Sequence, residues 1–185
     1  MVLLVVDVQA GIVTPALYSF EAVRGNIQKL IGLARRSSVE VVYVRHDDGA
    51  GAVLSAGNDA FEIAADFAPQ AGERIFDKTV NTAFRGVCGD TGLTEYLHAK
   101  GVRRVMVVGL QTEYCIDATI KSGFEHGFEM IVPEFANSTV DNSFMSGELS
   151  YHYYNSFIWP NRYALCVTMR EAEEILSAEG ELDGI

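Results

Sequence analysis

The feature that most constrains the fold is a continuous apolar run that ends at a glycine shortly before a cysteine. Residues 105–108 (Val-Met-Val-Val) do not alternate with polar residues, which is typical of a parallel strand covered on both faces. Gly109 ends this run, and Cys115 follows it. Residues 2–6 form a second such run, which ends at Asp7. The sequence therefore predicts a buried parallel sheet with polar residues beyond the carboxyl ends of its strands.

Strand and helix patterns alternate along the rest of the chain. Further strands are predicted at residues 39–44, 74–76, 128–132 and 163–167, and helices at residues 23–36, 91–101, 113–127 and 169–176. Residues 49–72 show no sustained period and are expected to form a long loop with one short helical turn. An aromatic-rich helical segment at 143–158 could line a pocket, form a subunit interface or simply pack in the core. This order predicts one α/β domain with right-handed crossovers.

Composition narrows the classes of partner and compartment. The 185 residues, 49% of them apolar, fit one domain over residues 1–177, followed by a short, frayed acidic tail at 178–185. A net charge of −11 argues against nucleic acid or an anionic membrane as partner and favours a small molecule. The three cysteines, Cys88, Cys115 and Cys166, are far apart, which favours a reducing cytoplasm. No apolar stretch approaches the roughly 20 residues that a membrane span requires.

Cys115 is the first candidate for chemistry. It is expected in the first turn of a helix that Thr112 caps, where free backbone N–H groups and the helix dipole favour a thiolate over a thiol. The same N–H groups could hold a developing oxyanion. Asp7 lies beyond a strand, where ligands bind in open α/β sheets. The alternatives are that Cys115 is a small buried apolar residue and that Asp7 caps a turn.

A polar cluster, Arg45-His46-Asp47-Asp48, follows the second predicted strand. A histidine beside two aspartates suggests a metal, but the chain has no second histidine at a usable spacing, so a solvated loop is favoured. Arg45 and Arg85 are candidate anchors for a substrate carboxylate, because a guanidinium can hold one in a bidentate grip. A surface ion pair is the alternative for both.

Three segments together resemble the isochorismatase-like cysteine hydrolases: Asp7-Val8-Gln9, residues 78–84 (Lys-Thr-Val-Asn-Thr-Ala-Phe) and residues 109–115 (Gly-Leu-Gln-Thr-Glu-Tyr-Cys). They stand in the order and at the spacing of that family, and the resemblance extends over residues 2–139. It implies a three-layer α/β/α, Rossmann-like domain with a six-stranded parallel sheet, assembled into a dimer or tetramer.

The resemblance also implies a role for each matching residue. Asp7 would be the general base, Lys78 would pair with it and position it, and Cys115 would attack. The backbone N–H groups of Gln111 and Cys115 would hold the oxyanion, with a cis peptide bond before Gln111. Two further side chains in the matching segments are candidate substrate contacts, Gln9 and Phe84.

The presence of Cys115 favours hydrolysis of a C–N bond in a small amide or ureido compound through a thioester. Two alternatives remain open: cleavage of a vinyl ether using Asp7 without covalent catalysis, and small-molecule binding without turnover. The nicotinamidase branch of the family binds a metal through an Asp-x-His pattern and a further histidine, which residues 45–48 do not supply. We therefore expect neither a metal nor another cofactor.

Overall fold

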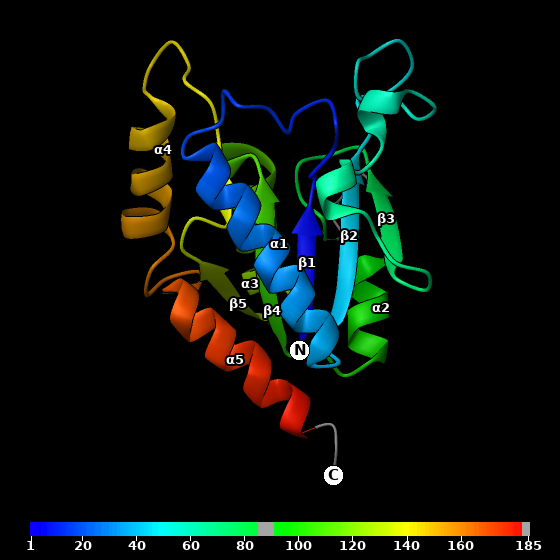
Figure 1. The fold of residues 1–185 in the computed structure, drawn as a ribbon, viewed down its shortest axis with the longest axis vertical. Helices are drawn as coiled ribbons and strands as arrows, with labels where there is room; N and C mark the ends of the chain where they lie inside the picture. The colour runs from blue at the N-terminus through cyan, green and yellow to red at the C-terminus, as the bar shows by residue number, and fades with distance from the viewer. Residues whose placement is uncertain (85–90, 183–185) are drawn as a thin grey trace.

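The computed structural model describes residues 1–84 and 91–182, and Figure 1 shows a sheet flanked by helices. Its strands are β1 (Val2–Val6), β2 (Glu40–His46), β3 (Arg74–Lys78), β4 (Arg104–Leu110), β5 (Glu129–Pro133), β6 (Asn137–Ser138) and β7 (Leu165–Val167). Its α-helices are α1 (Phe20–Arg36), α2 (Leu93–Ala99), α3 (Asp117–Glu125), α4 (Gly147–Tyr153) and α5 (Met169–Leu182). Short 3₁₀ turns, η1 (Asp59–Phe61) and η2 (Ala65–Phe67), interrupt the long loop, and π-helical turns form η3 (Thr112–Ile116) and η4 (Tyr154–Ile158).

The sheet is parallel at every pairing, with the order β3-β2-β1-β4-β5-β7. The predicted six-stranded parallel sheet is therefore confirmed, and the two-residue strand β6 adds a seventh by pairing with the end of β4. β1 lies between β2 and β4, which makes it a central strand. Its five residues are all buried, as a strand covered on both faces requires.

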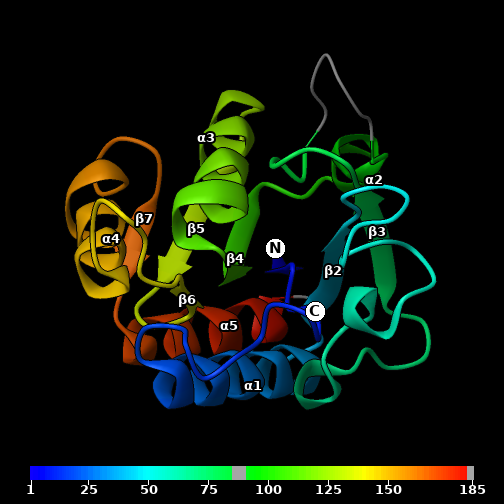
Figure 2. The same ribbon diagram turned by 90° about the horizontal axis from the view of Figure 1, so that it is seen from above.

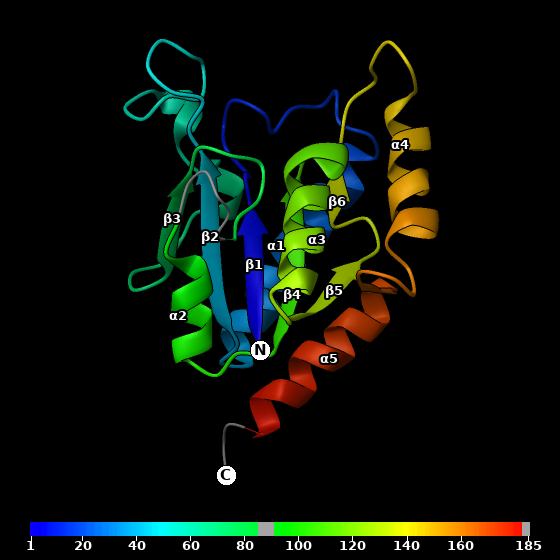
Figure 3. The same cartoon turned by 180° about the vertical axis from the view of Figure 1, so that it is seen from behind.

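Two apolar layers sandwich the sheet, because successive residues of a strand point to opposite faces. Leu3 and Val5 of β1 pack in a core shared with α1 and α5, whereas Leu4 and Val6 pack in a second core shared with α2 and α3. Figures 2 and 3 show these two helix pairs on opposite faces, with α4 beside the sheet. The predicted three-layer α/β/α architecture is confirmed.

Helix α1 forms where its apolar spacing predicts it. The buried face of this helix consists of Val23, Ile27, Leu30, Ile31 and Ala34, and Arg35 and Arg36 lie in its last turn, where basic side chains complement the helix dipole. Burying one such aliphatic side chain stabilises the fold by about 1.5–3 kcal/mol. This buried face fixes helix α1 on the sheet.

The end of the chain differs from the prediction. Helix α5 continues to Leu182, so the tail expected at 178–185 is wrong for residues 178–182. The reason is electrostatic: Glu179 accepts hydrogen bonds from the amino terminus of Met1 at 3.5 Å and from Arg104 at 2.6 Å, which hold the last turns on the domain. Among the helices of residues 1–84 and 91–182, none is long and apolar enough to cross a membrane.

Candidate active site

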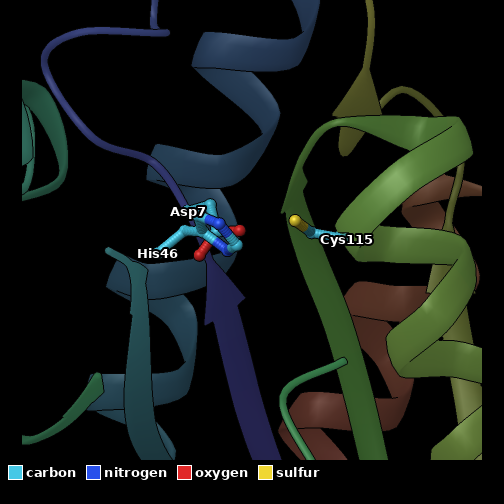
Figure 4. Close-up of side chains that lie close together, drawn as sticks. All are labelled: Asp7, His46 and Cys115. Carbon is cyan, nitrogen blue, oxygen red and sulfur yellow. The ribbon is translucent and has the colours of Figure 1, made fainter. Parts of the chain in front are cut away.

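Four reactive side chains meet beyond the carboxyl ends of β1 to β4. Asp7 follows β1, His46 and Lys78 are the last residues of β2 and β3, and Cys115 lies in η3 directly after β4. His46 pairs in register with Lys78 on the neighbouring strand, which places the two side chains next to each other on one face. Figure 4 shows Asp7 and His46 together, with the sulfur of Cys115 directed toward them. The three strand-end residues predicted from sequence are therefore brought together.

The ammonium group of Lys78 is the centre of this cluster. Its Nζ lies 2.7 Å from Oδ2 of Asp7, 3.1 Å from Sγ of Cys115 and 2.8 Å from Nδ1 of His46. The side chains of Lys78 and Asp7 are 0% and 1% exposed. Because water is excluded, each of these charge interactions is stronger than it would be at the surface. The lysine thus holds the acid and the thiol in one arrangement.

A glycine allows the cysteine to come this close to Asp7. Gly109 has a φ of 128°, and a Cβ atom there would lie 1.9 Å from the carbonyl oxygen of Val6, its neighbour in register on β1. Only glycine lets the end of β4 approach β1 so closely. Asp7, directly after β1, has a φ of 52°, a conformation that a non-glycine residue adopts only when its surroundings impose it.

The turn that carries Cys115 differs from the expected α-helical start. η3 is a π-helical turn preceded by Gln111, and Thr112 does not cap it. The hydroxyl of Thr112 is buried and donates instead to Oδ1 of Asn137 at 2.8 Å, because β6 pairs beside the end of β4. The peptide bond between Leu110 and Gln111 is cis, as the family resemblance implies.

The surroundings of Cys115 shift the pKa of its thiol in opposite directions. Burial, and after it the negative charge of Asp7, raise the pKa of the thiol to about 12, although Lys78 acts in the opposite direction. Burial therefore opposes the thiolate that the helix start is expected to favour. Burial also raises the pKa of the Asp7 carboxyl, with Lys78 opposing it. A carboxylate with a raised pKa is a better base, so this pair is suited to proton transfer during attack.

The cluster resembles a metal site but contains its own cation. One ligand atom from each of Asp7, His46 and Cys115 lies within 4.8 Å of the other two. The ammonium of Lys78 lies within 2.7–3.1 Å of all three residues, where a bound ion would have to lie. A divalent ion next to an ammonium would be strongly repelled in this buried site. The residues present therefore do not fit a metal in this arrangement.

Two of the candidate substrate contacts are structural residues. Gln9 is fully buried, and its side-chain amide donates to the carbonyl oxygens of His46 at 3.0 Å and Phe61 at 2.8 Å. Phe84 is also fully buried and stacks on Phe128 with ring centroids 5.2 Å apart. Neither side chain has surface left for a substrate, because the core uses both.

Of the two candidate carboxylate anchors, Arg45 is turned away from the site. Arg45 precedes His46 on β2, so its side chain points to the opposite face. There it pairs with Asp77 at 2.8 Å and with Glu62 at 2.7 Å, which is the ion pair that stood as the alternative. Arg85 lies outside the described residues.

His46 is the functional residue that the sequence reasoning misplaced. The solvated loop expected for residues 45–48 begins later than predicted, because β2 extends through His46. The side chain is 15% exposed and points to the face that carries Lys78. The signal available in the sequence was the polar residue itself, standing at a strand end like Asp7 and Lys78. Asn81, whose Oδ1 lies 3.9 Å from Sγ of Cys115, was also not singled out.

Known proteins resemble this chain in sequence. The sequence model of the Isochorismatase domain matches residues 1–151. A streptothricin hydrolase of Streptomyces noursei is 33% identical over 141 residues, which are 75% of this chain and 50% of that protein. A maleamate amidohydrolase of Pseudomonas putida is 34% identical over 149 residues, covering 70% of this chain and 68% of the relative. The chain thus spans half the length of the first relative and about two thirds of the second.

Solved structures share the fold over most of the chain. An isochorismatase family protein superposes with a TM-score of 0.80 at 26% identity, covering 90% of this chain and 96% of its own. A cysteine hydrolase from Pseudomonas syringae pv. phaseolicola gives a TM-score of 0.84 at 24% identity, with coverages of 96% and 92%. The second likeness is one of fold alone.

Proposed function

The chain belongs to the isochorismatase family, and from this premise we propose that it hydrolyses the C–N bond of a small amide or ureido compound through a thioester on Cys115. The observation that carries the proposal is the position of the Lys78 ammonium, 2.7 Å from the Asp7 carboxylate and 3.1 Å from the Cys115 sulfur. A base, a nucleophile and a fixed cation in mutual contact are what covalent attack on a carbonyl requires. Relatives named for amide hydrolysis support the same reaction class.

In the first half of the reaction, Asp7 takes the proton of the thiol as Sγ attacks the carbonyl carbon of the substrate. The thiol is protonated at rest, since its pKa is raised to about 12, so base and nucleophile must act together. The C–S bond forms and the carbonyl electrons move to oxygen. When the tetrahedral intermediate collapses, the C–N bond breaks, and Asp7 returns its proton to the departing nitrogen. Ammonia or an amine leaves, and the acyl group stays on Cys115 as a thioester.

In the second half, Asp7 deprotonates a water molecule that attacks the thioester carbon. The C–S bond breaks, the carboxylic acid leaves, and the proton returns to sulfur. Lys78 stays in place through both halves and compensates the negative charge as it moves between sulfur and carboxylate.

The oxyanion of both tetrahedral states needs donors near Cys115. The backbone N–H of Gln111 has no hydrogen-bond acceptor among the described residues, while its carbonyl oxygen accepts from Tyr114 and Ile116. This N–H and that of Cys115 are the donors that we propose for the oxyanion. A pair of fixed donors of this kind contributes about 10²–10³-fold in rate per donor.

A panel of amides tests the proposal. The compounds are those that the names of related hydrolases indicate, namely maleamate, nicotinamide, ureidoacrylate and streptothricin. We expect the wild-type chain to hydrolyse at least one amide of this class, and Cys115→Ala to lose that activity while remaining folded. Cleavage of isochorismate by both chains, with no amide turned over, would favour the vinyl-ether route through Asp7. Ligand-induced stabilisation without any product would favour a binding protein.

Two properties of the whole protein remain predictions, one from the family resemblance and one from the number and spacing of the cysteines. We propose a dimer or tetramer, which light scattering coupled to gel filtration would measure. We also propose a reducing cytoplasm as the compartment, which is compatible with a mechanism that needs a free thiol.

A further inference from the structure

The contacts of Lys78 determine which atoms carry protons. A lysine ammonium has three N–H donors and no lone pair, so each polar neighbour must be an acceptor. Lys78 has three such neighbours: Oδ2 of Asp7, Sγ of Cys115 and Nδ1 of His46. The contacts with Sγ and Nδ1 have hydrogen-bond geometry, and the contact with Oδ2 is an ion pair at 2.7 Å. Nδ1 of His46 must present its lone pair to the lysine.

This requirement assigns the tautomer of His46 from the hydrogen-bond network. With Nδ1 as acceptor, the ring hydrogen lies on Nε2, which is 3.0 Å from Oδ1 of Asp48. A carboxylate there accepts the Nε2–H and stabilises this tautomer. Lys78 then donates a hydrogen bond to Nδ1 of His46, and Nε2 of His46 donates one to Asp48.

Two hydrogen bonds with the Gln9 side chain fix the backbone of His46. The Gln9 side chain donates to its carbonyl oxygen at 3.0 Å, and the Gln9 oxygen accepts from its N–H at 2.8 Å. Gln9 comes two residues after Asp7, so one segment holds the acid and the histidine in a fixed relation. The imidazole is thereby aimed at Lys78 by Asp48 from one side and by Gln9 through the backbone.

We propose that His46, oriented by Asp48, is a positioning residue that fixes the Lys78 ammonium between Asp7 and Cys115. This inference rests on the proposed function. The lysine side chain is long and rotates freely unless each N–H is held. Without the acceptor at Nδ1, one donor is left buried and unpaired, and the ammonium turns away from the line between carboxylate and sulfur. Attack by the thiol and return of its proton would both slow.

Two variants separate this role from simple packing. His46→Asn keeps an acceptor near the position of Nδ1, whereas His46→Leu has similar bulk and offers none. We expect kcat to stay within about threefold of wild type for H46N and to fall about 10- to 100-fold for H46L, the range for losing a hydrogen bond to a charged group. KM should change little in both variants, since the proposed role of His46 acts on Lys78 and the reacting thiol. Equal losses of kcat in the two variants would overturn the inference.

A second readout needs no substrate and separates this inference from the proposed function. Lys78 lowers the thiol pKa of Cys115, so a displaced lysine should slow alkylation of Cys115 by iodoacetamide at fixed pH. We expect alkylation about tenfold slower in H46L and nearly unchanged in H46N, as quantified by peptide mass spectrometry. Wild-type rates in both variants would overturn the positioning role. The expected alkylation pattern without turnover of any amide would instead remove the proposed function.

Variants at Asp48 keep the test decisive if H46L does not fold. Asp48→Asn retains an acceptor for the Nε2–H, and Asp48→Ala removes it. We expect a smaller fall in kcat, about threefold, for D48A, and less for D48N, because Asp48 is about half exposed and water replaces part of its contact. A D48N variant that loses more activity than D48A would contradict the assigned direction of the hydrogen bond.

Discussion

Two cysteines of this chain, Cys115 after β4 and Cys166 in β7, both have a thiol whose pKa is raised. Burial is the main cause that raises the pKa of both, to about 12 for Cys115 and to about 11 for Cys166. Both lie next to strand ends or edges of the same sheet. The third cysteine, Cys88, lies outside the described residues. On hydrophobic environment alone, the two described thiols would be judged equally inert.

Their neighbours differ. Cys166 lines a cavity of about 520 Å³, and burial is the cause that raises its pKa. Cys115 is more enclosed and has Asp7 and Lys78 against it. The two described thiols thus differ in the charged partners held against Cys115, and the proposed function assigns the reaction to the thiol that has them. Burial is then an advantage, because it strengthens those charge interactions.

The largest expected effect is on the nucleophile. Cys115→Ala should lower the rate of amide hydrolysis by about 10⁴-fold or more, because Cys115 is the thiol that lies against Lys78 and Asp7 among the described residues. Ammonia release from the best amide of the panel measures it, and circular dichroism checks the fold. A rate of hydrolysis within tenfold of wild type would show that Cys115 is not the nucleophile and would contradict the proposed difference between the two thiols.

Replacing the base should separate turnover from thiol reactivity. Asp7→Asn should lower kcat by about 10²–10⁴-fold, because the proton acceptor is lost. Its negative charge also raises the thiol pKa, so removing it should move the pH profile of Cys115 alkylation to lower pH. Alkylation between pH 6 and pH 10, followed by mass spectrometry, tests this sign. A profile that moves to higher pH would contradict the arrangement, and Cys166 provides an unchanged control in the same chain.

The close approach of β4 to β1, which brings Cys115 near Asp7, can be tested by substituting two glycines. Gly109→Ala would place a Cβ 1.9 Å from the carbonyl of Val6, so we expect a loss of about 3 kcal/mol or more in the free energy of unfolding. Gly25→Ala in α1 meets no atom within 4 Å and should stabilise the protein by about 0.5–1 kcal/mol. Chemical denaturation of both variants measures the contrast. A harmless G109A would mean that β4 does not need to approach β1 this closely.

The smallest expected effect is at the second thiol. Cys166→Ala removes a half-buried side chain that contacts no catalytic group, so kcat should stay within about twofold of wild type. The free energy of unfolding should fall by about 1 kcal/mol, as for a typical partly buried position. Steady-state kinetics and thermal melting test both values. A large loss of kcat would show that Cys166 takes part in the reaction after all.

The sequence predicts this fold well because its signals are strong and local. Unbroken apolar runs define β1 and β4, and the spacing of Val23, Ile27 and Leu30 defines the buried face of α1. Three strand ends, those that carry Asp7, Lys78 and Cys115, could be matched to one family pattern. Parallel strands of one sheet end at the same edge, so the meeting of these three residues follows from the order of the elements.

Other parts of the site could not be read from the chain because they depend on contacts between distant segments. His46 was placed in a loop because the apolar run stops at Val44, yet pairing with β3 extends β2 by two residues. The family resemblance makes Gln9 a candidate substrate contact, yet its side-chain amide is used by the backbone of β2. Burial and the charge of Asp7, which raise the pKa of the Cys115 thiol, also depend on the packing of distant segments.

The most direct test of the account is to trap the covalent intermediate. The chain is mixed with its best amide substrate, quenched in acid within the first turnovers, and analysed by mass spectrometry of the intact protein and its peptides. The account predicts one acyl group on Cys115, with the mass of the substrate minus its amine, and none on Cys166. Rapid turnover with Cys115 unmodified at every time point, together with full activity of Cys115→Ala, would contradict it.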